Sequence, residues 1–86
     1  MHDEPVNPHS EPAVRLQRAA LLELLDAPAG AAIARDAVAG QLGVAPDVLA
    51  AALDALAARG LAVADGEQVR ASDAARALDE LGLIAI

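Results

Sequence analysis

The sequence contains no aromatic residue, no cysteine and no lysine. Without cysteine, the chain can form neither a disulfide nor a thiolate metal site. Without aromatic side chains, a core must be packed closely from small aliphatic ones, chiefly alanine, leucine and valine. Since hydrophobic residues make up 56% of the 86 residues, the composition predicts one small domain with such a core.

Residues suited to catalysis, metal binding or cofactor binding are also scarce. The two serines, Ser10 and Ser72, stand at expected helix starts, and His2 and His9 fall in a proline-rich terminal stretch. This distribution does not bring a nucleophile and a base together on a rigid frame. The glycines are isolated and form no phosphate-binding loop. We therefore expect a protein that is not an enzyme and that uses no cofactor and no metal.

Positive charge is limited to six arginines, against thirteen acidic residues, which gives a net charge of −7. Because DNA and anionic membranes attract basic proteins, this balance disfavours both as partners. No apolar run reaches the roughly 18 residues that span a bilayer. The acidic, proline-rich N-terminus is also unlike a signal peptide, so we expect a cytoplasmic protein that binds no membrane.

The first twelve residues differ in composition from the rest. They contain three of the five prolines together with several charges, and such a stretch buries too little apolar surface to become ordered. We expect a disordered acidic tail at 1–12 and one domain at 13–86. Ser10 is placed to cap the first helix, with Glu11 and Pro12 in its first turn.

That first helix carries Val14, Leu21 and Leu25 on one face, which predicts an apolar stripe. A short extended segment is expected at 30–35, followed by a helix at 36–42. The pattern up to this point is typical of a small helical domain.

The most informative stretch is 38–71. Gly43 breaks one helix, Pro46 suits the first turn of the next, and Gly60 ends it. Leucines recur at helical spacing in this helix, at Leu49, Leu53 and Leu56. Two short apolar runs then flank the hairpin-turn dipeptide Asp65-Gly66. The predicted fold class is mainly α with a small β-hairpin wing.

A final helix is expected from Ser72, which is a good N-cap, to Gly82. One of its faces is apolar and consists of Ala74, Ala77, Leu78 and Leu81. The other carries Arg76, Asp79 and Glu80, where Arg76 and Glu80 are spaced to pair. The apolar segment 83–86 follows, and we expect it to pack on this domain or on a partner.

The segment 38–63 resembles the winged-helix superfamily, for instance the N-terminal domain of biotin-operon repressors and small bacterial regulators. The matching features are the Leu42-Gly43-Val44 turn, the leucine spacing and Gly60-Leu61 before the wing. The resemblance covers about 14–71 and implies a winged-helix-like three-helix core, here with an additional C-terminal helix. It also implies that the segment 30–35 pairs with the wing, and that the helix after Pro46 enters the DNA major groove.

The predicted DNA-reading face departs from that family. It consists of Asp47, Ala51, Asp54 and Ala58, flanked by Ala50 and Ala55. Base readout needs arginine, lysine or an uncharged polar side chain on such a face, and none is present. The wing adds Asp65 and Glu67 against a single Arg70. Alanines edged by carboxylates instead favour close approach of another helix or of a basic protein surface.

These observations favour a non-catalytic regulatory or adaptor module that binds a protein partner or self-associates, which includes a dimer. The predicted contact residues are Asp47, Ala50, Ala51, Asp54, Ala55, Ala58, Leu83, Ile84 and Ile86. The alternative is a DNA-binding transcriptional regulator of the winged-helix type. Its nucleic-acid contacts would be Arg35, Arg59 and Arg70.

Overall fold

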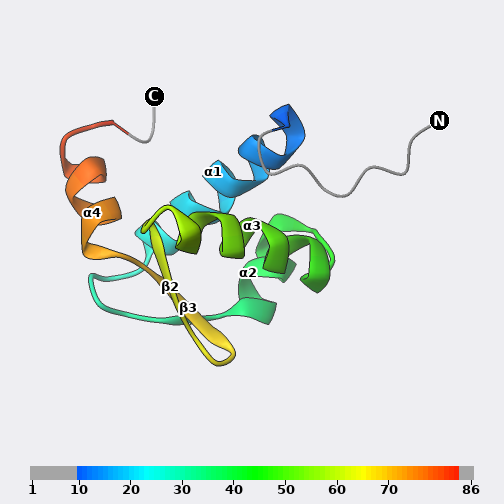
Figure 1. Ribbon diagram of the computed structural model, residues 1–86. Coiled ribbons are helices and arrows are strands. Elements are labelled where there is room, and N and C mark those ends of the chain that lie inside the picture. Colours follow the sequence, from blue (N-terminus) through cyan, green and yellow to red (C-terminus); the bar gives the residue numbers. More distant parts are fainter. Residues whose placement is uncertain (1–9, 84–86) are drawn as a thin grey trace.

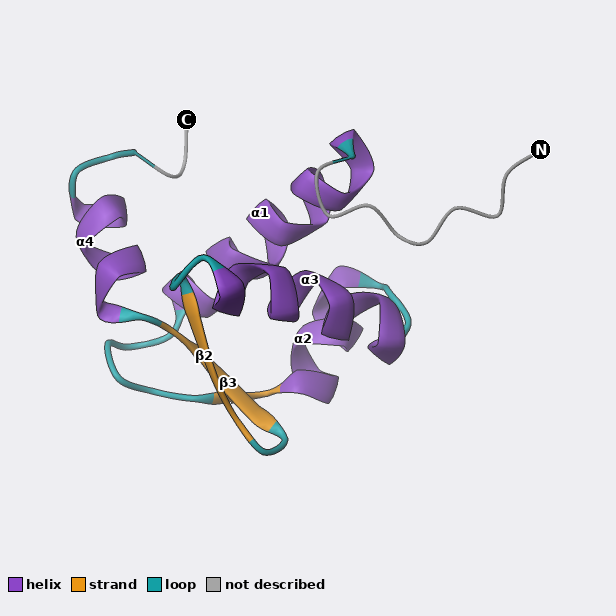
Figure 2. Cartoon of the chain, in the orientation of Figure 1, coloured by secondary structure: helices purple, strands orange, loops and turns teal. Residues whose placement is uncertain are grey.

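Four helices and a three-stranded antiparallel sheet make up residues 10–83, the part of the chain that the computed structural model describes (Figure 1, Figure 2). In chain order they are α1 (Glu11–Asp26), β1 (Ile33–Ala34), α2 (Arg35–Leu42), α3 (Pro46–Ala58), β2 (Ala62–Asp65), β3 (Gln68–Ala71) and α4 (Asp73–Glu80). The predicted class, mainly α with a small β-hairpin wing, is confirmed.

Helix α1 begins at its predicted cap. The Ala13 N–H donates to the Ser10 hydroxyl (3.3 Å), and Glu11 and Pro12 fill the first turn, where an acidic side chain and a proline are favoured. Glu11 and Pro12 therefore belong to the helix, although we assigned residues 1–12 to the tail. Residues 1–9 lie outside the described part of the chain.

The inward face of α1 is rotated from the predicted one. Gln17, Leu21 and Leu24 are buried, whereas Leu25 is half-buried and Val14 is 42% exposed. Four leucines within five residues cover two adjoining faces of a helix, so their spacing does not determine which of the two faces is buried. The packing of α1 against α3 determines it.

Helices α2 and α3 form a helix-turn-helix with a bend of 109° between them, within the roughly 90–120° typical of this motif. The turn rests on Gly43, whose φ of +67° suits glycine, and the following Val44 N–H donates to the Ala39 carbonyl (3.1 Å). Among the described residues no single helix has the length and apolar character to cross a membrane. The bent pair α2–α3 meets those two criteria only when its helices are taken together.

The sheet has the strand order β1-β3-β2, with Ile33 opposite Val69 and Ala62 opposite Ala71. The expected pairing of the segment 30–35 with the wing is thereby confirmed. This register turns Ala62, Val69 and Ala71 into the core. It places Val63 on the outer face, opposite Arg70.

The hairpin turn lies one residue later than predicted. Asp65 pairs with Gln68 and ends β2, so the two loop residues are Gly66 and Glu67. Gly66 has a φ of +62°, and no described residue other than glycine has a positive φ. A positive φ at the first loop position alone is typical of a type II′ turn, which requires glycine at that position.

The core lies between α1, α2, α3 and the inner face of the sheet. Its largest fully buried side chains are Leu24, Leu49, Leu53, Val38 and Val69. As predicted, the core consists of short aliphatic side chains with alanines between them. Each leucine therefore supplies a large share of the buried apolar area.

Helix α4 does not turn its whole apolar face inward. Ala75 is buried and Arg76 half-buried, whereas Ala74 and Ala77 are exposed and Leu81 is 71% exposed. Most of the expected apolar face thus points outward, whereas Leu78 is half-buried. The expected polar face contributes Arg76 to the interior. The reason is the contact that Arg76 makes with α1.

Arg76 closes the C-terminal end of α1. Its Nη2 donates to the carbonyls of Ala27 (2.9 Å) and Pro28 (3.1 Å), and lies 3.4 Å from that of Leu24. Leu24 lies in the last turn of α1, at the negative end of the helix dipole, and Ala27 and Pro28 follow directly after the helix. The arginine therefore joins two helices about fifty residues apart in sequence, and does not form the exposed pair with Glu80 that the spacing suggested.

We expect Arg76→Met to lower the free energy of unfolding by about 1 kcal/mol, because methionine keeps much of the apolar stem but cannot donate to the α1 carbonyls. Urea denaturation measures the difference. The matched control is Arg70→Met, since the Arg70 guanidinium donates only a long hydrogen bond, 3.4 Å, to the Ala71 carbonyl. Equal losses in the two variants would show that the contact with α1 adds nothing.

Candidate interaction surfaces

Helix α3 turns its leucines inward and leaves a face of carboxylates and alanines in solvent. Asp47, Ala51, Asp54 and Ala58 are exposed, and Ala50 and Ala55 are half-buried at the edges of this face. The structure places all six where the helical spacing predicted them. None of these side chains has a hydrogen-bond donor that could reach a base edge.

Val48 lies beside this face and was not among the predicted contact residues. Its side chain is 47% exposed in the first turn of α3. It precedes Ala51 by three residues and Ala55 by seven, so the three positions form one stripe along the helix. That spacing is the sequence signal that could have identified Val48.

The three arginines of the DNA-binding alternative have different surroundings. Arg35 starts α2, and its backbone N–H donates to the Glu67 carbonyl of the wing turn (2.9 Å). Arg59 follows the last residue of α3, and Arg70 lies on the outer face of β3. Within residues 10–83, the exposed α3 face carries none of the arginines.

Carboxylates dominate the remaining charge near α3 and the wing. Asp65 and Glu67 are exposed at the hairpin turn, and Asp47 and Asp54 are exposed on α3. The Arg15 guanidinium, at the start of α1, pairs with Glu11 one turn earlier. The surface that the winged-helix resemblance assigns to DNA is therefore negative.

An apolar groove runs between the first half of α1, the end of α3 and α4. We call it the α1–α4 groove; its volume is about 380 Å³. Its lining residues are Val14, Gln17, Arg18, Leu21, Leu56, Arg59, Leu61, Leu78 and Leu83. Leucines form most of its wall, with the two arginines among them. Val14 and Leu83 are 42% and 57% exposed, so the groove is open to solvent.

The outer face of α4 is a second uncovered apolar surface. It consists of Ala74, Ala77 and Leu81, all exposed. Figure 1 shows α4 at one side of the molecule, away from α2 and the wing tip. The predicted contact residues Ile84 and Ile86 lie outside the described part of the chain.

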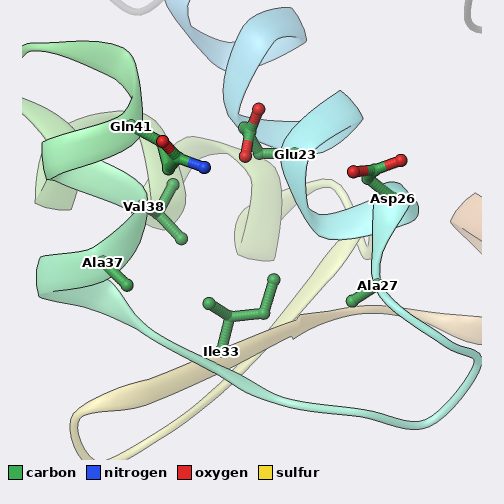
Figure 3. Close-up of a pocket in the computed structure, with 7 residues that line it drawn as sticks. All are labelled: Glu23, Asp26, Ala27, Ile33, Ala37, Val38 and Gln41. Carbon is green, nitrogen blue, oxygen red and sulfur yellow. The ribbon is translucent and has the colours of Figure 1, made fainter.

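A smaller pocket of about 230 Å³ lies between α1, β1 and α2 (Figure 3). Figure 3 shows Glu23 and Gln41 facing one another from α1 and α2, with Ile33 pointing into the space between them. Asp26 lies at the end of α1 beside it. This volume is below the roughly 300–1,000 Å³ of small-molecule sites. Sequence reasoning missed the pocket because its residues come from three separate elements and share no motif.

Residues 10–83 contain no group of three or more histidine, aspartate or glutamate side chains placed to hold a metal ion. The two serines cap helices, as the sequence suggested. Comparison of the chain with known proteins gave no match among family models, curated proteins or solved structures.

Proposed function

We propose that this domain is a non-catalytic regulatory or adaptor module that acts through contact with a protein partner. The observation that carries the proposal is the outward apolar face of α4, where Leu81 is 71% exposed. A helix this short gains little from propensity alone, and its apolar face remains in water. Contiguous apolar patches on the surface of a small domain are typical of interaction sites.

The exposed face of α3 supports the same proposal. Its alanines present little side-chain bulk, which permits close approach of another helix. Asp47 and Asp54 add negative charge to this face. Because the chain has a net charge of −7, a partner with a basic surface would be attracted at long range.

The second candidate is a DNA-binding transcriptional regulator. The 109° bend between α2 and α3 and the hairpin that follows favour it, since this arrangement places a helix in the major groove in proteins of that type. The acidic α3 face and the scattered arginines oppose it. Fold alone does not decide between the two, because one fold carries many functions.

A DNA titration separates the candidates. Random-sequence duplex is titrated at low salt with tens of micromolar protein, conditions under which even weak phosphate contacts give binding. We expect no binding. Binding that is lost on Arg59→Ala and Arg70→Ala would overturn the adaptor proposal and support the regulator.

A purified partner then tests the contact surface directly. A candidate captured by the immobilised domain is expressed, purified and measured by calorimetry against the wild type and two variants. We expect Leu81→Asp and Asp54→Arg each to weaken binding at least about tenfold, because a charge then enters an apolar contact or the charge on α3 is reversed. The matched control is Asp26→Arg, which reverses an exposed charge at the end of α1. Unchanged affinity in both test variants would exclude these faces.

A further inference from the structure

The α1–α4 groove has an apolar wall but no cover within residues 10–83. Leu21 and Leu56 are buried at its base, 4% and 3% exposed, while Val14 remains 42% exposed at its edge. Each apolar side chain that stays exposed in this groove does not gain the free energy of burial. An apolar segment that filled the groove would remove these side chains from water and so stabilise the fold.

The described chain ends at the groove itself. After α4 the chain reverses at Gly82, the Leu83 N–H donates to the Leu78 carbonyl (2.9 Å), and both leucines line the groove. In Figure 1 this segment turns back in the direction of α1. The next residues are Ile84, Ala85 and Ile86. Three extended residues reach about 10 Å, counted from Leu83, which itself lines the groove.

We infer that Ile84–Ile86 of the same chain occupies the α1–α4 groove, with an isoleucine side chain against Val14. The inference rests on the groove and on the path of the chain, and it is independent of the proposed function. It assigns Ile84 and Ile86, which we expected on the partner surface, to the domain itself. The partner surface then consists of the α3 face and the outer face of α4.

A second copy of the chain is a poorer occupant. Three residues bury a few hundred Å² at most, whereas stable association of two proteins buries about 1,200–2,000 Å². Two copies also carry −7 each and repel one another. Within one chain the segment has a high effective concentration at the groove, and this small contact suffices.

The N-terminal residues 1–9 are also a poorer occupant. They contain two prolines, two acidic residues and one valine, so they offer little branched apolar surface to a wall of leucines. The side chains of residues 84–86 are all apolar. The chemistry of the wall therefore selects the C-terminal segment.

Methyl NMR tests the contact on the full chain. Only three isoleucines occur, Ile33, Ile84 and Ile86, so Ile δ1 labelling together with Val and Leu labelling gives few and assignable signals. We expect nuclear Overhauser effects from Ile84 or Ile86 to the Val14 methyls, with Ile33, which packs against the core, as internal reference. Absence of any such effect to groove methyls would overturn the inference. A mixture of labelled and unlabelled chains identifies transfer between copies, which would overturn it in favour of a second copy.

Urea denaturation gives an independent readout. We expect Val14→Asp to raise the unfolding equilibrium constant about tenfold in the wild-type background, because the aspartate would face a docked isoleucine. In an Ile84→Ser/Ile86→Ser background, the same change should have no such effect. The matched control is Val48→Asp, which is also in a first helical turn and is 47% exposed, but does not line the groove. It should behave alike in both backgrounds, and a Val14 effect independent of background would overturn the inference.

Discussion

Replacing Leu53 with alanine is expected to lower the free energy of unfolding by about 3 kcal/mol. Leu53 is 1% exposed in the middle of α3 and is one of the largest fully buried side chains in the described chain. In a core without aromatic residues, no larger neighbour can move in to fill the space that the leucine leaves. The loss is therefore the transfer free energy of the removed methyl and methine groups plus the cost of a cavity.

This loss is large for so small a domain. A chain of 86 residues has a stability of roughly 4–13 kcal/mol, and the loss should lower Tm by more than about 10 °C. Thermal and urea denaturation followed by circular dichroism measure it. The matched control is Val48→Ala on the same helix, which should stay within about 0.5 kcal/mol of the wild type because Val48 is exposed. Similar losses in both variants would show that α3 is not packed as described.

Replacing Ser72 with alanine is expected to cost about 2 kcal/mol, although the side chain is small. The Ser72 hydroxyl donates to the Gly60 carbonyl (2.6 Å) and accepts from the Ala75 N–H (3.1 Å). Its backbone N–H donates to the Leu61 carbonyl (3.0 Å). One residue thus joins the end of α3 to the start of α4, and alanine leaves a carbonyl and an N–H without their partner.

Two other variants separate the contribution of the helix cap from that of the hydrogen bond to the Gly60 carbonyl. Ser10→Ala removes a similar cap at the open end of α1, where the bond is 3.3 Å, and should cost less than about 1 kcal/mol. Ser72→Asp keeps an acceptor for the Ala75 N–H but offers no donor to Gly60. We expect its stability to stay close to that of Ser72→Ala. Recovery of wild-type stability in Ser72→Asp would assign the whole effect to the cap.

The proposed partner surface combines a face that helical spacing defines with one whose exposed residues the structure selects. Asp47, Ala51, Asp54 and Ala58 share a helical face in any α3 whose leucines point inward, so spacing was enough to define it. The sequence placed Ala74, Ala77, Leu78 and Leu81 on one apolar face of the last helix. The structure leaves Ala74, Ala77 and Leu81 exposed and half-buries Leu78 in the α1–α4 groove.

Short-range chemistry in the sequence determined where the elements begin and end. Ser10 and Ser72 cap helices, Gly43 and Gly60 end them, and Pro46 starts α3, because each acts on backbone groups within a few residues. The order of helices and the hairpin followed from these positions. The turn was misplaced by one residue because Asp65-Gly66 and Gly66-Glu67 both satisfy hairpin chemistry, and only the pairing of β2 with β3 distinguishes them.

Only the tertiary structure decided which way α1 and α4 face. In α4, the apolar stripe of Ala74, Ala77 and Leu81 competes with Ala75 and Arg76 for the inward side. Hydrophobic periodicity separates the two faces of α4 clearly, but burying alanines contributes little free energy because they have little apolar area. The backbone carbonyls just after α1 then decide the outcome, because the Arg76 guanidinium donates to those of Ala27 and Pro28. That contact joins residues about fifty positions apart. Local periodicity compares residues only a few positions apart, so it cannot predict this contact.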